Sequence, residues 1–439
     1  MRVRLDELLV ARGLAASRSL AQRLVREGKV RVAGKANPKP GNPVPEDAEI
    51  EVEAPERFVS RGGWKLEGAF ETFGLDVEGL DCLDVGASTG GFTDCMLQHG
   101  AARVAALDVG HGQLHPKMLA DPRVLSREGF NCRALSPDDL PFTPRFAACD
   151  VSFISLRLIL PPMARVVAPG SFLVTLVKPQ FEAGRDEVGR GGVVRDQKVR
   201  DRVLQDIRAF GTGELGLEWA GVRESPIRGA AGNVEYTALW RKPDDKKSLR
   251  RAARAMREAH AAEAPVSALA ALRETPEWNA ARTVLLYLPA PGGGEPDTAD
   301  LVADARARGV RLAVPAWVPD GVFGSCAWPP PGRYAPALLS GGAGLCAGPM
   351  GIAEPEDKVW IRPEEIDLWI VPGLLFDASG TRLGHGKGWI DRLLAGRRPD
   401  AAAFGLAFPW QVWSSPLPRE PHDRPVDRLI LAGAPDRAR

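Results

Sequence analysis

The chain has 439 residues, of which 44% are hydrophobic and 26% are charged, and its net charge is +1. This length predicts two or three domains with separate cores, and the composition excludes a disordered or fibrous chain. No apolar run reaches the ~18 residues that a membrane span needs, and the six cysteines show neither a C-x-x-C pair nor zinc spacing. We therefore expect a cytoplasmic protein without membrane contact; no feature indicates its oligomeric state.

Residues 1–60 predict a small α+β domain with a basic surface. Ser17 is a candidate N-cap for a helix with one apolar face, Gly28 fits its C-terminal end, and residues 29–32 alternate as a strand. Residues 1–40 hold ten Lys or Arg against three acids, which indicates a polyanionic partner. The open alternative is a solvated basic helix without a partner.

The motifs RLDELL (4–9), GLAASRSLA (13–21) and VRVAGK (30–35), extended by KPG (39–41), resemble the RNA-binding domain named after a small-subunit ribosomal protein. Such a surface recognises folded RNA by its backbone and shape rather than by base edges. The expected partner is therefore rRNA or a ribosomal subunit, and the candidate contacts are Arg18, Arg23, Arg26 and Lys29.

Residues 61–242 predict a Rossmann-like domain with a doubly wound parallel sheet. Candidate strands at 81–85, 104–108, 146–151 and 172–178 alternate with helical patterns. A glycine-rich loop follows the first strand, and an acid ends the second; the candidate ligand contacts are Asp84, Gly86, Ser88, Gly90, Gly91 and Asp108. The loop has no lysine and lacks G-x-G-x-x-G order, so it suits a methyl donor with an adenosine better than a phosphate or a dinucleotide.

Five motifs in order, SRGGWKL (60–66), LDVGASTGGF (83–92), DVGHGQL (108–114), DVSFIS (150–155) and LVKPQFE (176–182), resemble the TlyA family of rRNA 2′-O-methyltransferases, whose catalytic domain is FtsJ-like. The resemblance implies S-adenosylmethionine as the methyl donor and a cytidine in rRNA as the target. It also implies a catalytic tetrad of Lys65, Asp150, Lys178 and Glu235. The start of the chain, almost at the RNA-binding unit, favours the large subunit.

A ribose hydroxyl is a weak nucleophile, so its methylation needs a base or strong orientation. A lysine near a second lysine, and partly desolvated, has a lowered pKa and can accept the proton. We expect Lys178 to be this base, and we expect Asp150 and Glu235 to orient the lysines and the hydroxyl. Lys65 would add the electrostatic field of a positive charge. Taken singly, Lys178 could close a strand and Asp150 could cap a helix.

Residues 246–435 predict a second α/β domain, after a short charged segment at 242–246. A helix is expected at 246–262 and strands at 283–287, 311–314 and 368–371. A second glycine-rich loop interleaves glycines with cations, as phosphate binding requires. Its candidate contacts are Arg382, Gly384, His385, Gly386, Lys387, Gly388 and Trp389, joined by Lys246 and Arg250, which lie one helical turn apart.

This loop, together with KxxLR (246–250), EPDT (295–298), VPGLLFD (371–377), Gln411, Pro418 and HD (422–423), resembles 5-formyltetrahydrofolate cyclo-ligase. The resemblance implies an ATP-dependent conversion of 5-formyltetrahydrofolate to 5,10-methenyltetrahydrofolate. It implies that Glu295, with Arg250, holds the folate and that Asp391 and Asp423 bind Mg²⁺. The family usually has two aromatic residues before the loop aspartate, whereas this chain has Trp389 and Ile390.

The leading hypothesis is thus a bifunctional enzyme. One alternative is an rRNA methyltransferase with a catalytically inactive, folate-binding or scaffold C-terminal domain, because Ile390 could weaken stacking on ATP or folate. Another is a cyclo-ligase whose N-terminal half only binds RNA.

Overall fold

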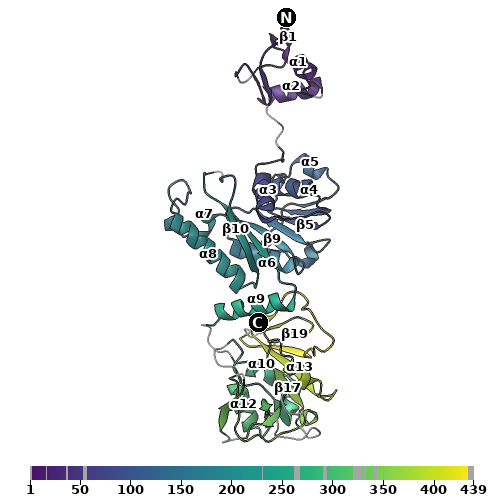
Figure 1. Cartoon of the computed structure of the whole chain (residues 1–439), viewed down its shortest axis with the longest axis vertical. Coiled ribbons are helices and arrows are strands. Elements are labelled where there is room, and N and C mark those ends of the chain that lie inside the picture. The colour runs from purple at the N-terminus through teal and green to yellow at the C-terminus, as the bar shows by residue number, and fades with distance from the viewer. Residues whose placement is uncertain are drawn as a thin grey trace. The chain divides into compact units, whose positions relative to one another are not determined.

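The computed structural model describes the chain except for residues 1, 16, 36–37, 53–56, 230, 262–266, 290–293, 320–328, 330–332, 341–343, 350 and 434–439. The chain divides into two compact units, Met1–Ser60 and Arg61–Arg439, and Figure 1 follows both from the N-terminus to the C-terminus. No helix of the described residues combines the length and apolarity that a bilayer span would require.

The first unit packs two helices against two short antiparallel strand pairs. Its apolar core is built from Leu5, Leu9, Ala21, Val25 and Val30. The Ser17 side chain accepts a hydrogen bond from the Leu20 backbone N–H, as predicted, and Gly28 follows the helix end with φ 74°. The elements are β1 (Arg2–Arg4), α1 (Leu5–Ala11), α2 (Arg18–Arg26), β2 (Val30–Val32), β3 (Pro43–Pro45) and β4 (Ile50–Val52), with β1 paired to β3 and β2 to β4.

The second unit contains two large sheets, and the first of them has seven strands. Five strands are parallel in the order β9-β8-β5-β6-β7, and β11 and β10 extend the β9 edge in antiparallel fashion. The strands are β5 (Asp81–Val85), β6 (Arg103–Leu107), β7 (Val124–Arg127), β8 (Phe146–Cys149), β9 (Phe172–Val177), β10 (Glu218–Glu224) and β11 (Tyr236–Arg241).

Helices cover both faces of this sheet (Figure 1). One apolar core joins α6 and α8 to the strands, through Ile159, Met163, Val203 and Ile207, while α3 and α4 pack together on the other side. The helices are α3 (Gly62–Phe73), α4 (Gly91–Gln98), α5 (Pro116–Leu119), α6 (Leu156–Val166), α7 (Pro179–Glu182) and α8 (Gln197–Gly213). Strand order reverses between β5 and β8, which confirms the predicted doubly wound fold.

The second large sheet has six strands in the order β14-β13-β12-β17-β20-β21, all parallel except β14. Its strand order reverses between β12 and β17. The strands are β12 (Thr283–Leu285), β13 (Arg311–Val318), β14 (Arg333–Leu338), β17 (Leu368–Val371), β20 (Ala402–Ala407) and β21 (Arg428–Leu431). Two small ribbons accompany it, β15 (Leu345–Ala347) with β16 (Ala353–Pro355) and β18 (Leu375–Phe376) with β19 (Arg382–Leu383).

Helices again lie on both faces, so the predicted second α/β architecture is confirmed. Leu272, Trp278 and Leu301 pack on one face, and Ile390 and Leu393 pack on the other. The helices are α9 (Lys246–Ala259), α10 (Leu269–Arg273), α11 (Pro276–Ala280), α12 (Ala299–Ala307) and α13 (Trp389–Leu394). Single 3-10 turns lie at η1 (Cys132–Ala134), η2 (Pro137–Asp139), η3 (Arg185–Glu187), η4 (Pro363–Glu365) and η5 (Pro409–Gln411).

Several predicted boundaries need correction. The strand expected at 146–151 ends at Cys149, and the strand expected at 283–287 ends at Leu285. The helix expected at 246–262 ends at Ala259, and residue 262 lies outside the described residues, as do 434–435 of the predicted last domain. Leu286 and Tyr287 show the reason at one strand end, because they stay buried although the strand has ended.

Candidate functional sites

The first glycine-rich loop lies where strand order reverses in the seven-stranded sheet. β5 ends at Val85 and β8 at Cys149, so Gly86 and Asp150 leave neighbouring strands at the same edge. Gly86 has φ 83°, and a Cβ there would lie 2.8 Å from the Asp150 carbonyl oxygen. Gly90 has φ 94° and no room beside Met118. The loop therefore requires glycine at both positions and leaves its backbone open to a ligand.

Two predicted acids flank this loop. Asp84 is fully buried and accepts a hydrogen bond from the Thr93 hydroxyl at 2.6 Å, while its Oδ1 has no hydrogen-bond partner among the described residues. Burial raises the pKa of Asp84 to about 7. Asp108 accepts backbone N–H bonds from Ser88 and Gly110, both at 2.7 Å. A buried acceptor without a partner, beside a loop that a Cβ would fill, fits a ligand with a polar amine and an adenosine.

The four predicted tetrad residues converge at this edge of the sheet. Lys65, on α3, donates to Glu235 at 2.8 Å and to Asp150 at 3.2 Å. The Lys178 ammonium, directly after β9, lies 2.6 Å from the Asp150 carboxylate. Glu235 precedes β11, so four separate elements supply the cluster. Two lysines and two acids balance one another in charge, and all are buried except Asp150, whose side chain is 19% exposed.

The two lysines differ in their surroundings. Burial lowers the pKa of Lys65, but the carboxylates of Asp150 and Glu235 offset this effect, and its pKa is raised overall. Lys65 is therefore held as an ammonium, in keeping with its predicted role as a positive charge beside the base. Lys178 has a single carboxylate beside it and donates a second bond to the Ser152 hydroxyl at 2.8 Å.

Sequence reasoning gave no role to two residues beside the tetrad. Ser152 is the hydroxyl partner of Lys178, and Phe153 is 90% exposed with φ 63°. The Phe153 ring lies 5.1 Å from the ring of Phe181. A strained backbone that holds an apolar ring in solvent is typical of a functional site. Both residues belong to the DVSFIS motif, but the sequence alone did not single them out within it. The structure does so through the Ser152 contact with Lys178 and through the backbone angle and exposure of Phe153.

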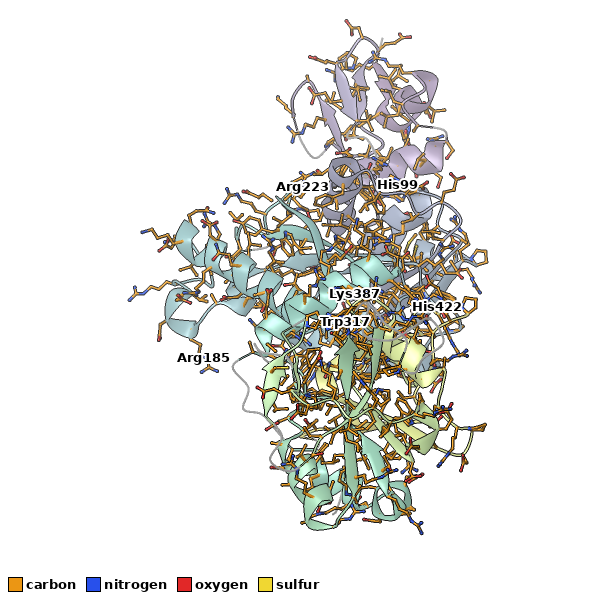
Figure 2. The ribbon with its side chains drawn as sticks, turned by 60° about the horizontal axis from the view of Figure 1, so that its bottom comes forward. His99, Arg185, Arg223, Trp317, Lys387 and His422 are labelled. Carbon is orange, nitrogen blue, oxygen red and sulfur yellow. The ribbon has the colours of Figure 1, made fainter. Side chains whose placement is uncertain are left out.

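The second glycine-rich loop borders a cavity of about 440 Å³ in the C-terminal half of the chain. The cavity lies at the ends of β12 and β17, where strand order reverses. Lys387 and His422, labelled in Figure 2, both line it. It is lined by every residue predicted for this half: Lys246, Arg250, Glu295, Arg382, Gly384, His385, Gly386, Lys387, Gly388, Trp389, Asp391 and Asp423.

The cavity is rich in positive charge. Arg250 donates to the Gly384 carbonyl at 2.9 Å, which fixes α9 against the loop. Partial burial lowers the pKa of His385, and the guanidinium groups of Arg257, Arg254 and Arg250 lower it further. Arg254, which also lines the cavity, was missed in the sequence although it lies one helical turn after Arg250. These cations fit a ligand with several phosphates.

The two predicted Mg²⁺ ligands both line the cavity, and both carry ion pairs. Asp391 accepts from Arg382 at 2.8 Å and from the Arg424 backbone N–H at 3.1 Å. Asp423 accepts from Lys246 at 2.7 Å, and its carboxylate clusters with the side chains of Glu420 and His422. The oxygen-rich donor set suits a hard cation such as Mg²⁺.

Ile390 differs in position from an aromatic residue that would stack on a ligand. It is 7% exposed and packs into the core with Trp369 and Leu393, and it also lines the cavity. Trp389, beside it, lies 4.9 Å from the ring of Tyr334, which comes from β14 and lines the same cavity. An aromatic pair is therefore present, supplied partly by a distant strand that the sequence motif could not indicate.

The four predicted RNA contacts of the first unit lie on and after α2. Arg18, Arg23 and Arg26 are exposed, and Lys29 is partly exposed. Arg18 is held at 3.2 Å from the fully buried Asp6, whereas Arg23 and Lys29 both approach Glu27. The surface is accessible to a polyanion, and Arg18 is the member whose position is most firmly set.

Three family models match the chain. An S4 domain matches residues 3–50, an FtsJ-like methyltransferase matches 58–242, and a 5-formyltetrahydrofolate cyclo-ligase family matches 239–432. These matches cover the three regions that the sequence motifs separate.

Individual relatives match either the N-terminal part or the C-terminal part of the chain. The chain is 44% identical over 250 residues to the 16S/23S rRNA (cytidine-2′-O)-methyltransferase TlyA of Mycobacterium tuberculosis, covering 56% of this chain and 92% of the relative. It is 43% identical over 237 residues to Hemolysin A of Brachyspira hyodysenteriae, covering 54% and 98%. It is 31% identical over 154 residues to the 5-formyltetrahydrofolate cyclo-ligase of Mycolicibacterium smegmatis, covering 34% and 73%.

Proposed function

Because the chain belongs to the TlyA family of rRNA methyltransferases in its N-terminal part and to the 5-formyltetrahydrofolate cyclo-ligase family in its C-terminal part, we propose that it is one enzyme with both activities. It methylates the 2′-hydroxyl of a cytidine in rRNA, and it converts 5-formyltetrahydrofolate to 5,10-methenyltetrahydrofolate with ATP. The observation that carries the proposal is that each half has a complete set of reactive side chains gathered at its own switch point.

The methyl donor binds at the first glycine loop. S-adenosylmethionine, when bound, supplies an electrophilic methyl group. The backbone of Gly86 and Gly90 admits the donor closely, Asp108 is the acid for its ribose hydroxyls, and the unpartnered Asp84 Oδ1 is the buried acceptor for its amine. The chain's task is to hold the ribose 2′-hydroxyl of the RNA in line with that methyl group.

Lys178 takes the hydroxyl proton. Lys65 is doubly bound by carboxylates, with a raised pKa, and so acts as a fixed positive charge that orients Asp150 and Glu235. Among the described residues Lys178 contacts one carboxylate, Asp150, and one hydroxyl, Ser152, so we assign it the role of the base. The tetrad thereby divides into an orienting lysine and a reactive lysine.

The RNA reaches the tetrad from the side of Phe153. Its exposed ring, next to Ser152, can stack on an unpaired nucleobase and hold the target ribose near Lys178. The basic face with Arg18, Arg23, Arg26 and Lys29 binds the folded RNA elsewhere along its backbone.

The phosphates of ATP bind at the second loop. Lys387, Arg382 and the backbone of Gly384–Gly388 surround the phosphates, and Lys246, Arg250 and Arg254 neutralise charge from α9. Asp391 and Asp423, with Glu420 beside Asp423, would hold Mg²⁺, which would neutralise phosphate charge. The γ-phosphoryl group of ATP would pass to the formyl oxygen with ADP as the leaving group, and phosphate would leave when the neighbouring nitrogen attacks the formyl carbon.

The folate lies against the aromatic wall of the same cavity. Glu295 is the acid that holds it, and Trp389 with Tyr334 supplies a flat apolar surface for its ring system. Since Ile390 is mainly a core residue, its departure from the family's aromatic pattern leaves this surface in place. This observation favours an active domain over the inactive scaffold alternative.

Formation of methenyltetrahydrofolate by the purified chain, followed by its absorbance, tests the cyclo-ligase activity. The expected result is product formation that requires ATP and a divalent cation and that falls in a Lys387→Ala variant. A rate no higher in the wild-type chain than in Lys387→Ala leaves only the methyltransferase.

A further inference from the structure

A second cluster of metal-ligating side chains lies away from both sites, between α3 and α4. It consists of Glu67 on α3 and of Cys95 and His99 on α4. Cys95 and His99 are four residues apart, so they lie on the same face of the helix, one turn from each other. Glu67 is two residues after Lys65 on α3, and residues two apart lie on different sides of a helix. The Glu67 side chain is therefore directed away from the tetrad. Figure 2 labels His99.

The ligand atoms are already close to coordinating positions. The Cys95 Sγ lies 3.6 Å from the Glu67 Oε2, and the His99 Nε2 lies 2.7 Å from the same oxygen. Tetrahedral zinc bonds to sulfur, nitrogen and oxygen place S and O about 3.6 Å apart and N and O about 3.4 Å apart. The S–O separation matches, and the His99 ring needs to withdraw by about 0.7 Å, which its partial exposure allows.

Burial gives the cluster a reason to take up a cation. Glu67 is 5% exposed and Cys95 is 0% exposed, so a carboxylate charge is enclosed beside a thiol. A divalent cation would compensate the carboxylate and stabilise the thiolate, and the thiol proton would leave to solvent. The His99 side chain is 30% exposed, so water can complete a fourth position on that side. Mixed oxygen, sulfur and nitrogen ligands suit zinc better than magnesium.

We propose that Glu67, Cys95 and His99 form a structural site for Zn²⁺ or a similar transition-metal ion, distinct from the Mg²⁺ ligands of the C-terminal half. The ion joins the helix that carries Lys65 to the helix that begins at Gly91, directly after the first glycine loop. It therefore fixes Lys65, the orienting lysine of the tetrad, relative to the loop without contacting the methyl donor or the RNA.

Cobalt titration of the full chain, after removal of metal with a chelator, tests the site. The expected result is one equivalent of Co²⁺ with a thiolate-to-cobalt charge-transfer absorption, displaced by Zn²⁺. Cys95→Ser abolishes this absorption, and His99→Gln weakens cobalt binding at least about tenfold. Cobalt bound near Asp423 would have oxygen and nitrogen ligands and would give no thiolate band.

Cys82→Ser is the matched control, because Cys82, on β5, is as fully buried as Cys95 but lies outside the cluster, and its thiol donates to the Leu80 carbonyl. It should leave the cobalt spectrum unchanged. Circular dichroism verifies that each variant is folded. If Cys95→Ser does not fold, His99→Gln tests the site instead, because His99 is partly exposed. Absence of the thiolate band in the wild-type chain, or its survival in His99→Gln with unchanged affinity, overturns the proposal.

Discussion

Replacement of Lys178 by methionine separates the chemistry of the tetrad from its contribution to stability. The side chain is 8% exposed, and its ammonium lies 2.6 Å from Asp150. Methionine keeps the length and the apolar stem but removes the charge and the proton acceptor. The cluster then changes from neutral to a charge of −1, while Asp150 retains Lys65 at 3.2 Å.

The two consequences differ in size. A positioned general base contributes about 10²–10⁴ in rate, which corresponds to about 3–5 kcal/mol of activation free energy. A hydrogen bond to a charged group contributes about 1.5–3 kcal/mol to the free energy of unfolding, and the buried methionine recovers part of it. We therefore expect Lys178→Met to lower methyl transfer at least about a hundredfold in a chain that remains folded and still binds S-adenosylmethionine.

Transfer of a radiolabelled methyl group to unmethylated ribosomal subunits measures the rate, and calorimetry measures donor binding. Lys242→Met is the matched control, since Lys242 is an equally buried lysine at the opposite end of β11 from Glu235, where it donates to the Ala164 and Val167 carbonyls. It should keep methyl transfer. If Lys178→Met retains more than about a tenth of the wild-type rate, Lys178 is not the base.

Four further outcomes follow from the same geometry. Gly86→Ala should abolish S-adenosylmethionine binding in calorimetry, because the added Cβ meets the Asp150 carbonyl and the left-handed backbone costs alanine about 1–2 kcal/mol; tight binding would refute the loop assignment. Lys387→Ala, at an exposed position, should slow methenyltetrahydrofolate formation by about 10–100-fold with an unchanged melting temperature, as expected for one lost charge-assisted phosphate contact. Ile390→Tyr should lower stability by about 1–3 kcal/mol in denaturant titration through overpacking, rather than raise folate affinity. Burial lowers the pKa of Lys242 from 10.5 to about 8, so between these pH values the unfolded chain binds one more proton than the folded chain. The free energy of unfolding should therefore increase by up to about 3 kcal/mol from this group as the pH rises from about 8 to 10.5. Lys242→Met should lack this increase.

The sequence predicted the reactive residues better than their surroundings. Both glycine loops follow strands, and glycine spacing is a local property, so Gly86 and Gly384 could be assigned from neighbouring residues alone. The tetrad could be assembled only through a family resemblance, because Lys65 and Glu235 are 170 residues apart and meet through sheet order.

The remaining features depend on tertiary structure. The pairing of Tyr334 with Trp389 joins β14 to α13, and nothing in either segment indicates the other. The raised pKa of Lys65 arises from two carboxylates that come from different strands. The sequence did not indicate the cluster of Glu67, Cys95 and His99, because Glu67 lies on a different helix from the C-x-x-x-H pair.

The most direct test of the whole account measures both activities in one preparation of the wild-type chain, alongside Lys178→Met and Lys387→Ala. We predict that the wild-type chain methylates rRNA and forms methenyltetrahydrofolate, that Lys178→Met loses only the first activity, and that Lys387→Ala loses only the second. A wild-type chain that lacks either activity, or a single substitution that removes both from a folded chain, would contradict two independent active sites on one polypeptide.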